Sequence, residues 1–185
     1  MKQVKLNVPY HSQFLEVEDH FWNIRSYGGT CIKMCLDYYH QFDNKIDNSS
    51  SILFIMNDAF NNGGYDAQHG FVHNFAVEYF KNHGLESNRL EGLESFDIIK
   101  DNLDNANPVV VSIIKRTLEQ EKFHLILIVG YEYDESSNAV LNVIYHEPES
   151  TDPSRGAYRI CDTDTFLKSW RGKAIFVRNK MAPTD

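Results

Sequence analysis

The hydrophobic pattern changes half-way along the chain, and this change limits the fold more than any other feature of the sequence. Before Pro108, apolar side chains recur at the three- and four-residue spacing of amphipathic helices. After Pro108, short apolar runs rich in Val and Ile alternate with turn residues, which is typical of β-strands. Helices followed by consecutive strands with short connections predict an α+β fold, in which N-terminal helices pack on an antiparallel β-sheet.

The first half is predicted to contain helices over 30–39, 52–60, 71–82 and about 95–103. The first of these carries an apolar stripe that includes Cys31 and Cys35, and Thr30 is its candidate N-cap. Ser51 ends a serine run that offers an N-cap to the second helix, and Gly84 is the candidate C′ residue of the third.

The second half is predicted to contain strands over 109–114, 124–131, 140–145, 157–161 and 174–177. A turn at 134–138 separates the second strand from the third. A last helix is expected over 164–170, with Thr163 as its N-cap, and the residues 6–10 form a short extended segment.

The 185 residues can build one sizeable core, so we expect a single domain over 1–185. The formal net charge of −8 repels phosphates, which makes nucleic acid and anionic membrane surfaces poor partners. No apolar run approaches the ~20 residues of a membrane helix, and the N-terminus lacks the apolar core of a signal peptide. Three cysteines give no disulfide framework, and reduced thiols suit a cytoplasmic location.

Several segments follow one another in a fixed order: LNVPYHSQ at 6–13, YGGTCIKMCLDYY at 27–39, NPVVV at 107–111, HLILIVGY at 124–131 and EP at 147–148. Their order and spacing resemble the C39-like family of papain-type cysteine peptidases. The nucleophile helix of that family reads roughly Cys-Gly-Pro-x-x-Leu-x-Met-x-Leu-x-Tyr-Tyr. The segment 27–39 matches its Gly, Met, Leu and Tyr-Tyr positions without a gap. The resemblance covers nearly the whole chain and implies a papain-like fold.

The resemblance also implies roles for individual residues. Gln13 matches the glutamine that contributes to the oxyanion hole, and His124 matches the general base. Glu147 stands where the family has an aspartate that orients this histidine, and a longer carboxylate can still hold an imidazole. The ungapped register places Tyr27 at the position of the nucleophilic cysteine, with Gly28 after it in the substrate cleft.

Tyr27 at this position changes the chemistry that the resemblance implies. A thiol titrates near ~8.5 and a helix N-terminus with a histidine activates it easily, whereas a phenol titrates near ~10. The phenol oxygen also extends well beyond the reach of a cysteine Sγ, into the slot of the scissile carbonyl. We therefore expect a catalytically inactive C39-like domain that binds a peptide or peptide-like segment. Tyr27, His124, Gln13 and Trp22 would line its cleft, although Trp22 could instead only staple the preceding loop.

Two alternatives remain open at this point. The domain could be an active cysteine peptidase or acyltransferase in which Cys31 is the nucleophile, with His124 and Glu147 as base and orienter. Against this, Cys31 lies about 6 Å further along the helix than Tyr27 and belongs to the apolar stripe. The fold could also persist as an interaction or oligomerisation scaffold with a vestigial cleft.

His69 and His73 have the i, i+4 spacing of a helical metal site. No third ligand is evident in the sequence, and Gly70 between them suggests a helix start. We therefore predict no metal and no cofactor.

Overall fold

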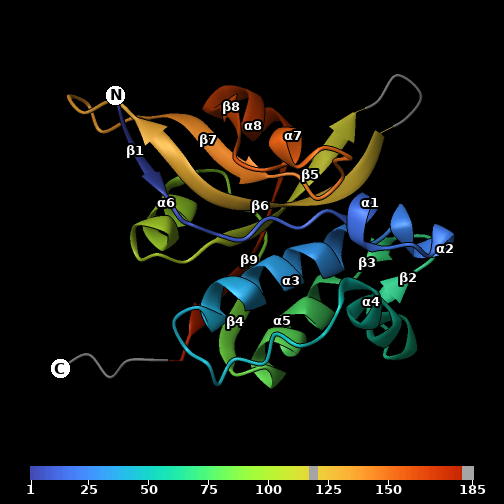
Figure 1. The fold of residues 1–185 in the computed structure, drawn as a ribbon. Coiled ribbons are helices and arrows are strands. Elements are labelled where there is room, and N and C mark those ends of the chain that lie inside the picture. Colours follow the sequence, from blue (N-terminus) through green and yellow to red (C-terminus); the bar gives the residue numbers. More distant parts are fainter. Residues whose placement is uncertain (117–120, 181–185) are drawn as a thin grey trace.

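The computed structural model of the protein describes residues 1–116 and 121–180. Its larger sheet has seven strands, β1 (Lys2–Lys5), β4 (Leu85–Leu90), β5 (Val109–Arg116), β6 (Glu121–Tyr133), β7 (Val140–His146), β8 (Arg159–Asp162) and β9 (Trp170–Asn179). They pair in the order β4-β9-β5-β6-β7-β8, and β1 adds to β6 (Figure 1). Every pairing is antiparallel, which confirms the predicted α+β fold.

The described residues also form a small hairpin and eight helices. The hairpin joins β2 (Tyr65–Asp66) to β3 (Gly70–Phe71). The helices are α1 (Gln13–Glu16), α2 (His20–Asn23), α3 (Tyr27–His40), α4 (Ile52–Asn61), α5 (His73–Asn82), α6 (Asp97–Asp104), α7 (Pro153–Gly156) and α8 (Thr163–Ser169). No described helix combines the length and the apolar character that a transmembrane span requires.

Helices cover both faces of the sheet (Figure 1). Because side chains alternate along a strand, β6 supplies both layers. Leu125 and Leu127 pack into one buried cluster with α3, α4 and α5. Ile126 and Ile128 pack into a second cluster with α6 and α8. The helical layer that contains α3 therefore stands against β6, the strand that carries His124.

Several local predictions are confirmed. The Ser51 hydroxyl accepts the Phe54 N–H and caps α4. Gly84 directly follows the C-cap of α5 and has a φ of +94°, a left-handed conformation that favours glycine. The predicted strands at 109–114, 124–131 and 140–145 lie within β5, β6 and β7.

The predicted start of the nucleophile helix is wrong. The helix α3 begins at Tyr27, three residues before Thr30, and Ser26 is the N-cap residue without a side-chain capping bond. Thr30 lies inside the first turn, where its hydroxyl donates to the Ser26 carbonyl at 2.8 Å. Two glycines disfavour a helix start by propensity, but packing against neighbouring elements outweighs that cost here.

Other boundaries also differ from the sequence-based prediction. Residues 6–10 were predicted only as an extended segment; the register with β6 ends at Lys5, and the Leu6 N–H still donates to the Val129 carbonyl at 2.8 Å. Phe71 belongs to the small hairpin, so α5 starts at His73. Asp162 caps α8 in place of Thr163, and its carboxylate accepts the Thr165 N–H at 2.8 Å. No local sequence pattern predicts the short or polar elements β1, β2, β3, β4, α1, α2 and α7.

Candidate functional site

Tyr27 is the first residue of α3, and its ring lies against the imidazole of His124. The two ring centroids are 5.2 Å apart, in an edge-to-face arrangement. The Tyr27 hydroxyl extends to the small hairpin, where the Phe71 N–H points to it at 3.5 Å. Burial raises the pKa of Tyr27, and the contact with this N–H opposes the shift in part. The phenol is therefore neutral at physiological pH, and its oxygen faces the hairpin.

The glycines after Tyr27 permit this arrangement. A Cβ atom on Gly28 would lie 2.3 Å from the Phe71 ring, and one on Gly29 would lie 2.9 Å from the Met56 sulfur. Gly28 therefore lets the hairpin approach the start of α3, and Gly29 does the same for α4. This close packing places the hairpin over the Tyr27 side chain.

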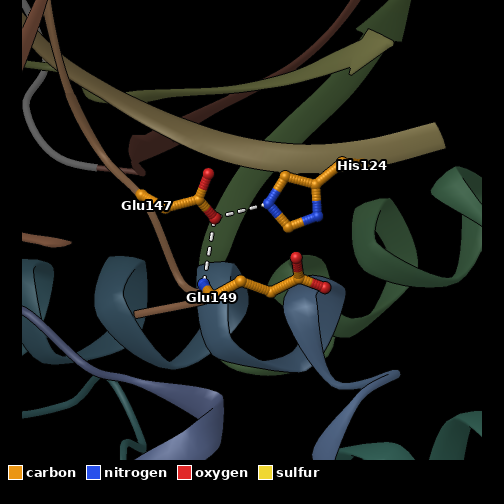
Figure 2. A group of neighbouring side chains, drawn as sticks. All are labelled: His124, Glu147 and Glu149. Carbon is orange, nitrogen blue, oxygen red and sulfur yellow. Dashed lines mark hydrogen bonds and ion pairs between the residues drawn. The ribbon is translucent and has the colours of Figure 1, made fainter. Parts of the chain in front are cut away.

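His124 and Glu147 form a buried pair (Figure 2). His124 lies on β6 and is fully buried, while Glu147 directly follows β7 and is 4% exposed. The Nε2 atom of His124 is 2.6 Å from Oε1 of Glu147. Among the described residues, the other ring nitrogen, Nδ1, has no hydrogen-bond partner. Because the carboxylate holds Nε2–H, the free Nδ1 of a neutral imidazole carries the lone pair.

Glu147 is held as an anion by its surroundings. Burial alone would raise its pKa, but the hydrogen bond and charge of His124, with Lys115 and the Glu149 N–H, lower the pKa to about 2. The Glu149 N–H donates to Glu147 Oε1 at 2.9 Å, and Lys115 Nζ lies 3.3 Å from Oε2. The carboxylate is thus ionised and fully engaged at any physiological pH.

Glu149 and two lysines complete the cluster, and the sequence analysis did not single them out. The Glu149 carboxylate pairs with Lys115 at 2.7 Å and with Lys122 at 2.6 Å. In the sequence, only the position of Glu149 two residues after Glu147 indicates that it belongs to this cluster. The segment folds back so that both carboxylates face the lysines of β5 and β6.

One candidate ligand atom from each of His124, Glu147 and Glu149 lies within 4.8 Å of the other two, close enough for a shared cation (Figure 2). The donor set does not favour one. Lys115 and Lys122 already neutralise the two carboxylates, and Glu147 engages His124 directly. A metal would have to displace these partners, so we assign no metal to the cluster.

Gln13 and Trp22 lie beneath the surface near the start of α3. Gln13 is fully buried, and its Nε2 donates to the Asn23 carbonyl at 2.8 Å. Its Oε1 has no hydrogen-bond partner among the described residues. Trp22 is 6% exposed and packs edge-on against Phe21, Phe60 and Tyr65. We call this cluster of four aromatic residues the aromatic rim: Phe21, Trp22, Phe60 and Tyr65.

The comparisons with known proteins agree with this architecture. The sequence profile of the Peptidase_C39-like family matches residues 5–174. The chain belongs to this family. A comparison with curated proteins found no significant match. Among solved structures, the peptidase domain of Streptococcus ComA, a bifunctional ABC transporter in a quorum-sensing pathway, is 20% identical, with a TM-score of 0.59 over 85% of this chain and 93% of that one.

A second similar structure is a double-glycine motif protease from an AMS/PCAT transporter in complex with its leader peptide. It is 13% identical to this C39-like chain and has a TM-score of 0.59, over 97% of this chain and 100% of that one. At these identities the likeness shows the papain-like fold that the sequence analysis expected, and the roles of individual residues rest on this chain's own geometry.

Cys31 is placed unfavourably for a nucleophile in this C39-like domain. It lies one turn into α3, is fully buried and belongs to the core. Burial, with smaller contributions from Cys35 and Glu147, raises the pKa of its thiol well above the usual value. A reactive cysteine needs the opposite shift and partial exposure. The geometry therefore gives the Cys31 alternative no support.

The i, i+4 histidine pair does not share a helix. His69 lies in the hairpin, is highly exposed and pairs with Asp66 at 2.8 Å. His73 is the first residue of α5, and its pKa is lowered to about 4 by burial and then by nearby Lys173 and Arg171. The predicted placement of both histidines on one helix is wrong, because the hairpin ends between them.

Proposed function

We propose that this C39-like domain is catalytically silent and binds a peptide segment. The proposal rests on one observation: a phenol, and no thiol, stands at the start of α3 against the ring of His124. In the family pattern, a thiol at this position gives its proton to the histidine and attacks the carbonyl. Tyr27 offers only a ring to His124, and its hydroxyl is turned toward Phe71.

The pKa of Tyr27 adds to this argument. Burial raises it above the ordinary phenol value, so phenolate is scarcer here than in water. The base and orienter pair of His124 and Glu147 is nevertheless kept at 2.6 Å. The site thus holds the groups that activate a nucleophile, but no group that they can activate.

Peptide binding is supported by the fold and by the surface beside Tyr27. A similar structure of the same fold is a complex with a leader peptide. In this chain Gln13 and His124 are fully buried, so a ligand would contact Tyr27 and the aromatic rim. Phe21 and Phe60 of the rim are 48% and 58% exposed, which leaves apolar area for peptide side chains.

A direct test uses a fluorescent synthetic leader peptide that ends in a double-glycine motif, with a scrambled peptide for comparison. We expect saturable binding of the leader peptide by fluorescence anisotropy and no cleavage by mass spectrometry after prolonged incubation. Phe21→Ser should weaken binding about tenfold or more, equivalent to about 1.4 kcal/mol. Leu141→Ser is the matched control, because Leu141 is 42% exposed at the opposite end of β7 from Glu147.

The two parts of the proposal fail in different ways. Cleavage of the leader peptide would disprove catalytic silence, and its persistence in Cys31→Ser would also remove Cys31 as the source. Equal binding of the leader and scrambled peptides, or no binding of either, would disprove peptide recognition and leave a vestigial scaffold as the better reading.

A further inference from the structure

A hollow of about 500 Å³ is lined in part by Glu147 but not by Tyr27, and its lining is strongly basic. We call it the basic groove. Four cationic side chains line it, from β5, β8 and α8: Lys115, Arg116, Arg159 and Lys168. Among the described residues, the only acidic one in its lining is Glu147, whose carboxylate is occupied by His124 and Lys115. This concentration of positive charge contrasts with the formal charge of −8 on the whole chain.

The cations of the basic groove are not all neutralised. In the described part of the chain, the ion pairs of the groove join Lys115 to Glu147 and Glu149, and Arg116 to Glu121. Arg159 instead faces the Tyr145 ring, with its guanidinium carbon 5.7 Å from the ring centroid. Arg159 and Lys168 are both exposed, so their charged groups are available to a ligand.

The groove also has an apolar component. Ile113, Ile114 and Tyr145 contribute to its lining and are each partly exposed. A planar guanidinium binds carboxylate or phosphate through two parallel hydrogen bonds, and an ammonium adds a strong point charge. Positive groups around an apolar wall match a ligand that carries an anionic group on an apolar body.

We propose that the basic groove binds a small ligand with carboxylate or phosphate groups on an apolar body, held by Arg159 and Lys168. This site is separate from the Tyr27 surface and does not depend on the proposed peptide binding. Lys115 connects the groove to the buried cluster, because it pairs with both Glu147 and Glu149. An anion in the groove therefore sits beside the lysine that holds the His124 orienter.

The test is a titration of the full chain with two probes, phthalate and phenylphosphate, followed by calorimetry or by amide chemical shifts. Phthalate carries two carboxylates and phenylphosphate carries one phosphate, each on an apolar ring. The probe that binds more tightly therefore identifies the anionic group that the groove prefers. Arg159→Gln and Lys168→Gln should each weaken binding about tenfold or more. Lys2→Gln removes the same charge at an exposed lysine of β1, paired with Glu135, and should change binding less than about twofold.

Arg159 and Lys168 are exposed, so their replacement leaves the core intact, and circular dichroism checks the fold. Absence of saturable binding of either probe to the wild-type chain would overturn the proposal. Equal weakening by Lys2→Gln would also overturn it, because the attraction would then belong to the whole surface. Retained binding of the leader peptide by Arg159→Gln would show that failure of the groove and failure of the peptide site are distinct.

Discussion

Replacing Tyr27 with cysteine should create a thiol of strongly lowered pKa, because the imidazole of His124 already packs against this position. An ordinary thiol titrates near ~8.5. A charged imidazole about 4 Å away is worth about 4 kcal/mol at an effective dielectric constant of about 20, and the N-terminus of α3 adds about 1 kcal/mol. At about 1.4 kcal/mol per pKa unit, the two effects lower the pKa by about 3–4 units. Burial offsets part of this, so we expect a pKa of about 5–6.

The native cysteines leave a clean background for measuring this pKa. Burial raises the pKa of Cys31 and of Cys35 well above the usual range, and that of Cys161 to about 11. None of them should react with iodoacetamide below pH 8. The rate of alkylation at residue 27, followed by mass spectrometry from pH 4 to pH 9, therefore reports the new thiol alone.

Two further variants separate the electrostatic effect from the cavity that the smaller side chain leaves. Removing a largely buried aromatic ring costs about 2–4 kcal/mol, and Tyr27→Ser should lose about the same stability without gaining reactivity. Adding His124→Gln to Tyr27→Cys should return the thiol pKa to about 8 or higher. A midpoint near 8.5 in the single variant, or one unmoved by His124→Gln, would refute the claim that His124 is positioned as a base.

Three further predictions concern stability. The pKa of His11 is raised to about 9, since its hydrogen bonds to Asp37 and a second carboxylate outweigh burial. Its contribution of about 2–3 kcal/mol to stability is complete below pH 6.5 and is lost as pH rises through 9. The free energy of unfolding of His11→Gln in urea should therefore change little between pH 6.5 and pH 9. Burial lowers the pKa of His146 to about 4, so stability should fall as pH drops from 6.5 to 4, and His146→Gln should reduce that slope. Gly28→Ala should destabilise the wild-type chain by about 2 kcal/mol or more, but should cost less or even stabilise in a Phe71→Ala background, as a double-mutant cycle in urea would show.

The sequence predicts the layers of the fold well because they follow strong hydrophobic periodicity. The strands β5, β6 and β7 are nearly continuous apolar runs, and α4 has a clear serine cap. The strand β4 was missed because it is an edge strand, and most of its side chains are polar. The hairpin of β2 and β3 was missed for a different reason: its packing against Gly28 is a tertiary contact that no local pattern records.

At the candidate site, the sequence places the principal residues but not their surroundings. The register through Tyr38 and Tyr39 predicts that Tyr27 and His124 line one cleft, and their ring centroids are 5.2 Å apart. It gives no hint that Lys115 bridges two carboxylates, because that contact depends on how the segment after β7 folds back. It also does not reveal that Gln13 is fully buried, since burial follows from the packing of α1 and α2 around it.

The pair of His124 and Glu147 has two possible explanations, a contribution to stability and a former role in catalysis. A buried ion pair is costly to break one partner at a time, so it could persist for stability alone. A histidine kept only for stability would be expected to satisfy both ring nitrogens, as His146 does with the Val8 carbonyl and the Tyr158 N–H. His124 leaves Nδ1 without a partner among the described residues, at a cost of about 1–3 kcal/mol. Because the ring of His124 packs against Tyr27, we interpret this histidine as the remnant of a catalytic base, and Tyr27→Cys tests this directly.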